Sequence, residues 1–181
     1  MLLKPQILLL SMILLSFFSN FSKNYVMASD KVGSVGIINN MITSFAKSNN
    51  VNFYAIRIHP GQDLKKEINK FVINNSIKAG AIVTGVGSLR QANLRLANEK
   101  EATMYKDKFE IVSLVGTIGL EGQHLHISIS DKTGKTVGGH LMDENIIYTT
   151  AEIVIIKFND LLFSREMDSI TNCKELVIKQ S

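Results

Sequence analysis

Three of the four histidines in this chain lie within one short segment, GQHLHISISDKTGKTVGGH, at residues 122–140. His124 and His126 alternate along a run that is typical of a β-strand, so both side chains point to the same face. His140 follows a turn and the pair Gly138-Gly139, which suits a close approach of two backbones or a bulge. Three imidazoles can bind one divalent cation and leave a coordination position open, as in catalytic zinc sites. Alternatively, the histidines form hydrogen bonds within a hairpin and fix a subunit interface.

The turn between the two strands decides whether the histidines meet. The sequence DKTGK predicts a three-residue loop that ends at Gly134 in the left-handed conformation and pairs Asp131 with Lys135. Counting back from that pair places His126 opposite His140, with Cβ atoms about 5 Å apart. A slip of one residue would move His140 to the opposite face. In the predicted register all three histidines share one face.

Other charged side chains are candidates for supporting chemistry. Glutamates are general acids or bases, and arginines bind anionic ligands. The glutamates are Glu110, Glu121 and Glu152, and the arginines are Arg57, Arg95 and Arg165. We take Arg57, Glu110 and Glu152 as candidate contacts to a ligand or to the histidines. The alternative for all six is a salt bridge at a strand edge or an interface. No catalytic residue is identified, and the sequence leaves open whether the protein is an enzyme.

The first half of the chain predicts two helices and one strand. Apolar residues recur near helical spacing between Ser34 and Lys47, which predicts a short helix. The run NFYAIRIH at 52–59 predicts a strand that ends before Pro60-Gly61. Asp63 is a suitable N-cap for a helix from Leu64 to about Ile77, with Gly80 just beyond its end.

After Gly80 the pattern changes to short strands separated by turn residues. The predicted strands span 81–88, 92–98, 109–119, 123–131, 136–141, 149–158 and 175–179. The fold class is therefore α+β, a single domain with a mostly antiparallel sheet and one main helix packed across it. The runs FEIVSLVGTIG and AEIVIIKF are too apolar for strands with one wet face, so they lie centrally in the sheet or in a subunit contact. We expect oligomerisation.

The N-terminus has the features of a secretory signal. Lys4 precedes an apolar run from Ile7 to Phe18, and small or apolar residues occupy Val26-Met27-Ala28. As a helix this run would span only about 18 Å, against roughly 30 Å of hydrocarbon. We therefore expect a cleaved signal peptide at 1–28, an N-terminal segment at 29–50 and the domain at 51–181. An uncleaved interfacial anchor is the alternative. The mature protein would be exported, periplasmic or secreted, without stable membrane insertion.

The charge pattern argues against nucleic-acid binding, and the cysteine content excludes an internal disulfide. The chain has 20 basic and 16 acidic residues, and loss of Lys4 and Lys23 with the signal leaves 18 against 16, or +2. Nucleic-acid binders usually show a dense basic patch, whereas here lysines alternate with acids. Cys173 is the single cysteine, so no internal disulfide can form and packing alone must stabilise the domain.

Several segments resemble, in order, the plants-and-prokaryotes-conserved (PPC) domain. They are HPGQDLKKEINKFV, AIVTGVGSLRQANLRLA, FEIVSLVGTIGLEGQHLHISISDKTGKTVGGHL and YTTAEIVI, within residues 52–179. The resemblance to stand-alone prokaryotic members implies an α+β fold that assembles as a homotrimer. The fold is also similar to acetolactate decarboxylase, whose zinc is held by three histidines. The matching positions are His124, His126 and His140, although the spacing to the third differs.

The resemblance leaves three functions open. In plants the domain accompanies AT-hook motifs, and prokaryotic members are commonly called DNA-binding proteins by analogy. This chain has no Arg-Gly-Arg-Pro AT-hook. The first interpretation is therefore an exported homotrimeric binding or assembly module with a three-histidine site for a divalent metal, zinc being the expected ion, and with a small-molecule ligand as a candidate partner. The second is a metal-dependent lyase, by analogy of fold. The third is DNA binding, which the charge pattern does not favour.

Overall fold

The computed structural model describes residues 36–38, 41–43 and 45–181. All of them belong to one compact unit, Gly33–Ser181. The predicted signal peptide, residues 1–28, lies outside the described residues, as do parts of the predicted N-terminal segment.

The predicted helix between Ser34 and Lys47 is wrong. Two three-residue strands occupy this region, β1 (Gly36–Ile38) and β2 (Met41–Thr43), and they pair antiparallel with Ile37 opposite Ile42. The segment is rich in isoleucine, and β-branched residues favour extended backbone over helix. An apolar spacing that suits a helix therefore did not decide the conformation here.

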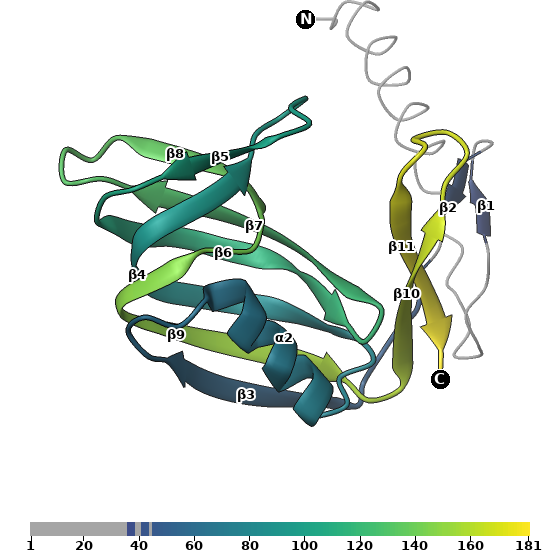
Figure 1. Cartoon of the computed structure of the whole chain (residues 1–181). Coiled ribbons are helices and arrows are strands. Elements are labelled where there is room, and N and C mark those ends of the chain that lie inside the picture. Colours follow the sequence, from purple (N-terminus) through teal and green to yellow (C-terminus); the bar gives the residue numbers. More distant parts are fainter. Residues whose placement is uncertain (1–35, 39–40, 44) are drawn as a thin grey trace, which may run out of the picture. The chain divides into compact units, whose positions relative to one another are not determined.

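The main sheet is antiparallel throughout the part of the chain that the structure describes. Its strands are β3 (Val51–Ile58), β4 (Gly80–Arg95), β5 (Ala102–Tyr105), β6 (Phe109–Gly119), β7 (Gly122–Ser130), β8 (Thr136–Leu141) and β9 (Ile146–Phe158). The order is β3–β9–β4–β6–β7–β8, and β5 pairs with β4 (Figure 1). In addition, β8 pairs with the end of β4 through Leu94–Leu141 and Arg95–His140. The strands β4, β6, β7 and β8 thus form a closed circuit.

One long strand replaces two of the predicted ones. Residues 81–88 and 92–98 were expected as separate strands, but β4 runs for 16 residues, Gly80–Arg95. Its register against β9 shifts between Ile82 and Thr84 and twice between Gly87 and Gln91. Gly87 has φ +139°, and a Cβ there would lie 2.1 Å from the Thr150 carbonyl oxygen. Bulges bend a strand without ending it. The first part of β4 therefore pairs with β9 and β6, and its last residues pair with β5 and β8.

The helix α2 (Leu64–Asn74) begins where the sequence predicts and ends earlier. The Asp63 carboxylate accepts hydrogen bonds from the backbone N–H groups of Lys65 and Lys66, at 3.0 and 3.2 Å. At the other end, the Asn75 side chain donates to the Phe71 carbonyl oxygen, and Ser76 has φ +48°. This cap stops the helix before Ile77, because a left-handed residue cannot continue it.

The core lies between this helix and the sheet. The helix buries Leu64, Ile68 and Val72 against buried residues of the strands, including Leu89 and Ile153. The two apolar runs lie centrally in the sheet, which is one of the two positions expected for them, since β6 lies between β4 and β7 and β9 lies between β3 and β4. The predicted α+β class, with a mostly antiparallel sheet and one helix among the described residues, is also confirmed.

A second hairpin follows the sheet. It contains β10 (Leu161–Met167), which the sequence analysis missed, and β11 (Lys174–Gln180). Phe163 and Leu161 pack with Ala79 in a small second core. The Phe163 backbone N–H also donates to the Lys78 carbonyl oxygen at 3.1 Å. These contacts hold β10 against the residues just before β4 and bring Arg165 within reach of β7.

Replacement of the helix cap tests this account of α2. Asp63→Ala removes the two cap bonds and the acceptor for the Glu144 N–H at 2.6 Å. We expect the free energy of unfolding to fall by about 1–2 kcal/mol, as measured by urea denaturation. Glu101→Ala, at an exposed position before β5, is the control and should change stability little. Equal stability of the two variants would contradict the capping role.

Candidate metal centre

The predicted hairpin register is confirmed. His126 lies opposite His140, and Ile129 lies opposite Val137. Gly134 has φ +85°, and its N–H donates to the Asp131 carbonyl oxygen at 2.9 Å. The Asp131 carboxylate also accepts from the backbone N–H groups of Thr133 and Lys135. These bonds fix the loop length, and the loop length fixes which residues of β7 and β8 face each other.

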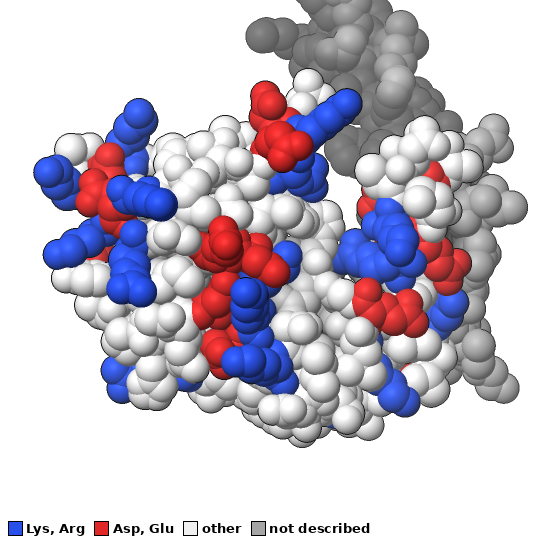
Figure 2. Space-filling view, in the orientation of Figure 1, with Lys and Arg blue, Asp and Glu red and all other residues white. Residues whose placement is uncertain are grey.

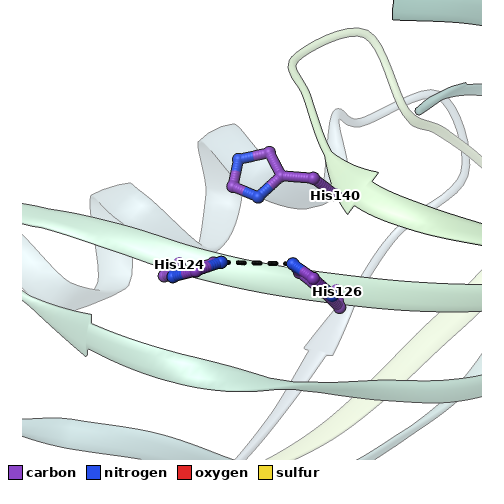
Figure 3. Close-up of side chains that lie close together, drawn as sticks. All are labelled: His124, His126 and His140. Carbon is purple, nitrogen blue, oxygen red and sulfur yellow. Dashed lines mark hydrogen bonds between the residues drawn. The ribbon is translucent and has the colours of Figure 1, made fainter. Parts of the chain in front are cut away.

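The three histidines converge on one face of this hairpin, with their rings pointing toward one another (Figure 3). The Nε2 atoms of His124 and His126 are 3.1 Å apart. Ring centroids are separated by 5.0 Å for His124–His126, 5.1 Å for His124–His140 and 5.5 Å for His126–His140. One ligand atom from each residue lies within 4.8 Å of the other two. Leu125 and Ile127 point the opposite way and are buried in the core.

Three glycines permit this geometry. Gly116 lies opposite Leu125 with φ +145°, and a Cβ there would lie 2.0 Å from the His124 carbonyl oxygen. On the other side, a Cβ at Gly139 would lie 2.8 Å from the Arg95 carbonyl oxygen, and one at Gly138 would lie 2.9 Å from the Ile127 carbonyl oxygen. The predicted close backbone approach at Gly138-Gly139 is therefore confirmed. The role of Gly116 was not recognised, because its partner lies on a separate strand.

Burial and nearby cations favour the neutral form of two of the histidines. Burial lowers the pKa of His140 to about 4, and the Arg95 guanidinium adds to the effect. Burial also lowers the pKa of His124 below its ordinary value, and the charges of Arg165 and His126 lower it further. Metal binding requires imidazole in its neutral form. The site therefore keeps these two rings ready to bind a cation.

Arg165 of β10 contacts the outer side of the cluster. Its Nη2 donates to Thr117 Oγ1 at 2.8 Å, and its Nη1 lies 3.3 Å from His124 Nδ1. A guanidinium has donors only, so His124 Nδ1 is the acceptor and the ring proton lies on Nε2. That N–H then donates to His126 Nε2. A metal ion bound at His124 Nε2 would require the ring proton to lie on Nδ1 instead, so the acceptor role of Nδ1 toward Arg165 belongs to the metal-free protein.

The residues present fit a divalent metal. A tetrahedral site with Zn–N bonds of 2.0–2.1 Å places ligand nitrogens about 3.3 Å apart. The His124–His126 separation of 3.1 Å already matches this spacing, and the 4.8 Å upper limit requires a closure of about 1.5 Å. Within the described residues, the buried Nδ1 of His140 has no hydrogen-bond partner. A buried nitrogen without a partner is costly unless something binds it.

A pocket of about 440 Å³ opens beside the histidines. Its walls come from the end of β4 and the loop after it, from β6, and from the β7–β8 hairpin; they include Arg95, Leu96, Asn98, Ser113, Val115, Ser128 and the three histidines. Arg95 pairs with His140 in the β4–β8 ladder. The closed circuit of strands therefore brings an arginine to the histidines from a distant part of the sequence.

The other candidate residues lie elsewhere on the sheet. Arg57 is opposite Glu152 in the β3–β9 pair and donates through Nε to Thr150 Oγ1 at 3.1 Å. Glu110 is opposite Ser130 at the far end of β6, and Glu121 accepts from the Arg165 backbone N–H at 3.4 Å. None of these four residues lines the pocket. Of the six charged candidates, the structure brings Arg95 and Arg165 to the histidines.

Comparison with known proteins gives the family. The sequence profile of the Plants and Prokaryotes Conserved domain matches residues 45–159, more than half of the chain. The chain belongs to this family. The resemblance found in the sequence is thereby confirmed.

Two curated relatives are similar over the same region. A bifunctional protein GlmU from Synechococcus sp. strain JA-3-3Ab is 42% identical over 127 residues, which are 70% of this chain and 20% of that protein. A second GlmU, from strain JA-2-3B'a(2-13), is 40% identical over 129 residues, 71% of this chain and 20% of that protein. The chain thus spans about a fifth of the length of the curated relatives it matches.

Three solved structures are similar in fold. A hypothetical protein from Salmonella enterica has 38% identity and a TM-score of 0.73, covering 75% of this chain and 97% of its own. The protein AF0104 from Archaeoglobus fulgidus, described as metal-containing, has 20% identity and a TM-score of 0.65. The match covers 75% of this chain and 99% of that protein. A candidate DNA-binding protein from Bacteroides thetaiotaomicron has 21% identity and a TM-score of 0.60, covering 83% and 99%.

The low pKa of His140 predicts a pH-dependent stability of the metal-free protein. The unfolded chain, with a histidine pKa of about 6.5, binds a proton between about pH 6.5 and pH 4 that folded His140 does not bind. The free energy of unfolding should therefore fall as the pH drops through this window and be constant above it. Urea denaturation in EDTA at about pH 7 and about pH 5 measures the difference. His140→Gln should reduce it, and an unchanged difference would contradict this assignment.

Proposed function

We propose that this protein is an exported, homotrimeric PPC-domain module that binds a divalent metal, zinc, through His124, His126 and His140. The observation that carries the proposal is the convergence of three imidazoles on one hairpin, with the buried Nδ1 of His140 unpartnered among the described residues. Three protein ligands leave one position of a tetrahedral ion open. The site therefore has the capacity to bind an exchangeable ligand as well as the metal.

The donor set favours a transition metal, and zinc is the ion that we expect. Imidazole suits zinc, copper, iron and nickel, whereas magnesium and calcium prefer oxygen ligands. The metal-containing description of the Archaeoglobus fulgidus protein, which shares the fold, supports a metal in this family. A bound ion would polarise a ligand oxygen or lower the pKa of a bound water. The chain's own residues, His124, His126 and His140, would supply the three nitrogens.

Elemental analysis tests the metal site. The full-length chain, purified without a histidine tag or chelator, should carry about one transition-metal ion per chain. The His124→Ala, His126→Ala, His140→Ala triple variant should carry none, because it lacks all three ligands. His59→Ala removes the fourth histidine, which is exposed beyond the end of β3, and should keep the metal. Equal metal content in wild type and triple variant would sink the proposal.

The trimer is supported by an apolar patch on the sheet. Five large side chains of β3, β4 and β6 are about half or more exposed: Phe53 (63%), Val83 (50%), Val86 (52%), Val112 (57%) and Val115 (49%). Val115 pairs with His126, so the apolar patch borders the histidines. Exposed apolar side chains grouped in this way commonly mark a protein contact. The number three is what the family resemblance implies.

Light scattering tests the assembly. The wild-type protein should have the mass of three chains, and Val86→Lys with Val112→Lys should yield monomers, because two buried cations per chain destabilise an apolar contact. Ile170→Lys is the matched control, since Ile170 is 88% exposed in the β10–β11 turn. A monomeric wild type, or an assembly unaffected by the double change, would overturn the trimer.

Export is part of the proposal and has its own support in the sequence. Residues 1–28 contain a cation, a 12-residue apolar run and small or apolar residues before Ser29. Among the residues that the structure describes, no helix is long and apolar enough to span a membrane. The domain boundaries at 28 and 50 belong to the same proposal.

DNA binding is the alternative function, and the descriptions of two proteins with this fold support it. The Bacteroides thetaiotaomicron protein and one from Ralstonia eutropha, which share the fold, are described as candidate DNA-binding proteins. On the face shown in Figure 2, however, lysine and arginine side chains are interspersed with acidic ones. Phosphate tracking needs concentrated positive charge, so we favour the metal-binding module. The lyase interpretation stays a prediction.

A further inference from the structure

The pocket beside the histidines has an unusual charge balance. Its walls contain the guanidinium of Arg95 and no aspartate or glutamate among the described residues. Within the same part of the chain, the Arg95 side chain makes no hydrogen bond or ion pair. Arg95 lies opposite His140 in the β4–β8 pair, next to the cluster. A cation without a counter-ion therefore faces three imidazoles across an open cavity.

The remaining walls offer both polar and apolar contacts. The side chains of Ser113, Ser128 and Asn98 line the pocket and have no hydrogen-bond partner among the described residues. Leu96 and Val115 provide apolar surface. Small-molecule sites usually occupy about 300–1,000 Å³ and combine apolar walls with a few placed polar groups. The cavity of about 440 Å³ falls in this range.

We propose that this pocket binds a small organic carboxylate, whose anionic end lies between the metal site and Arg95. The inference rests on the proposed metal site, because the open coordination position is one of the two attractions. Arginine is the other: its planar fork matches a carboxylate with two parallel charge-assisted hydrogen bonds. The apolar side of the pocket, at Leu96 and Val115, suits a short carbon chain.

The geometry selects this ligand class over larger anions. One arginine matches one carboxylate, whereas nucleotides and polyphosphates are usually held by several cations or by a glycine-rich loop before a helix. The lysines nearest in sequence to the pocket residues, Lys100, Lys132 and Lys135, do not line the pocket. Arg165 is engaged with Thr117 and His124. The pocket walls therefore offer one guanidinium beside the metal site, which matches one carboxylate.

Propionate and propionamide provide a matched pair of probes. They have nearly the same shape, but only propionate carries a charge. Titration of the zinc-loaded full-length chain, followed by ligand-observed NMR, should show saturable binding of propionate and at least tenfold weaker binding of propionamide. Arg95→Gln should weaken propionate binding about tenfold or more, because a charge-assisted bidentate pair is lost. Arg90→Gln, exposed on the same strand and absent from the pocket walls, should leave the affinity unchanged.

The outcomes separate this inference from the metal site. Metal content is measured on the same samples by elemental analysis, and Arg95→Gln should keep the wild-type content. The carboxylate site is overturned if the metal-loaded protein binds propionate and propionamide equally, or if Arg95→Gln leaves the affinity for propionate unchanged. Either result leaves the metal site standing. Binding of inorganic phosphate in place of propionate also overturns it. A protein that takes up no zinc overturns the proposed function itself, before any ligand is added.

Discussion

The pairing of β7 with β8 around a three-residue loop is the constraint on which the candidate site depends. The loop fixes the register, and the register sets His126 opposite His140. Because side chains alternate along a strand, one residue more or less in the turn would send His140 into the core. Gly116 and Gly139 then let the neighbouring strands approach closely enough to support the hairpin from both sides. The three histidines are thus positioned by backbone geometry more than by side-chain contacts.

The electrostatics of the site involve two opposed effects. Burial and the guanidinium groups of Arg95 and Arg165 keep the pKa values of His140 and His124 low, which favours the neutral, metal-binding form. The same positive charges repel a metal cation. An anionic ligand beside the ion would relieve this repulsion.

The sequence was sufficient for the local features of this site and insufficient for the distant ones. The DKTGK turn has specific conformational requirements, so the register and the facing of His126 and His140 could be counted from it. From the sequence alone, Arg95 could not be distinguished from Arg57 as a neighbour of the histidines. The approach of Arg95 to His140 depends on bulges that bend β4 toward β8. The helix end at Asn75 and the strands at 36–43 were misjudged for the opposite reason: local apolar spacing was given more weight than caps and β-branched residues.

The histidine cluster and the pocket beside it depend on contacts of very different sequence separation. His124, His126 and His140 lie within 17 residues, on two strands that share a tight turn, and such hairpins form in about 1–10 μs. Arg95 lies 45 residues before His140, and their pairing requires closure of the circuit through β4, β6, β7 and β8. Long-range pairing of this kind is slow. The three imidazoles can therefore gather before the domain is complete, whereas the pocket beside them exists only in the finished fold.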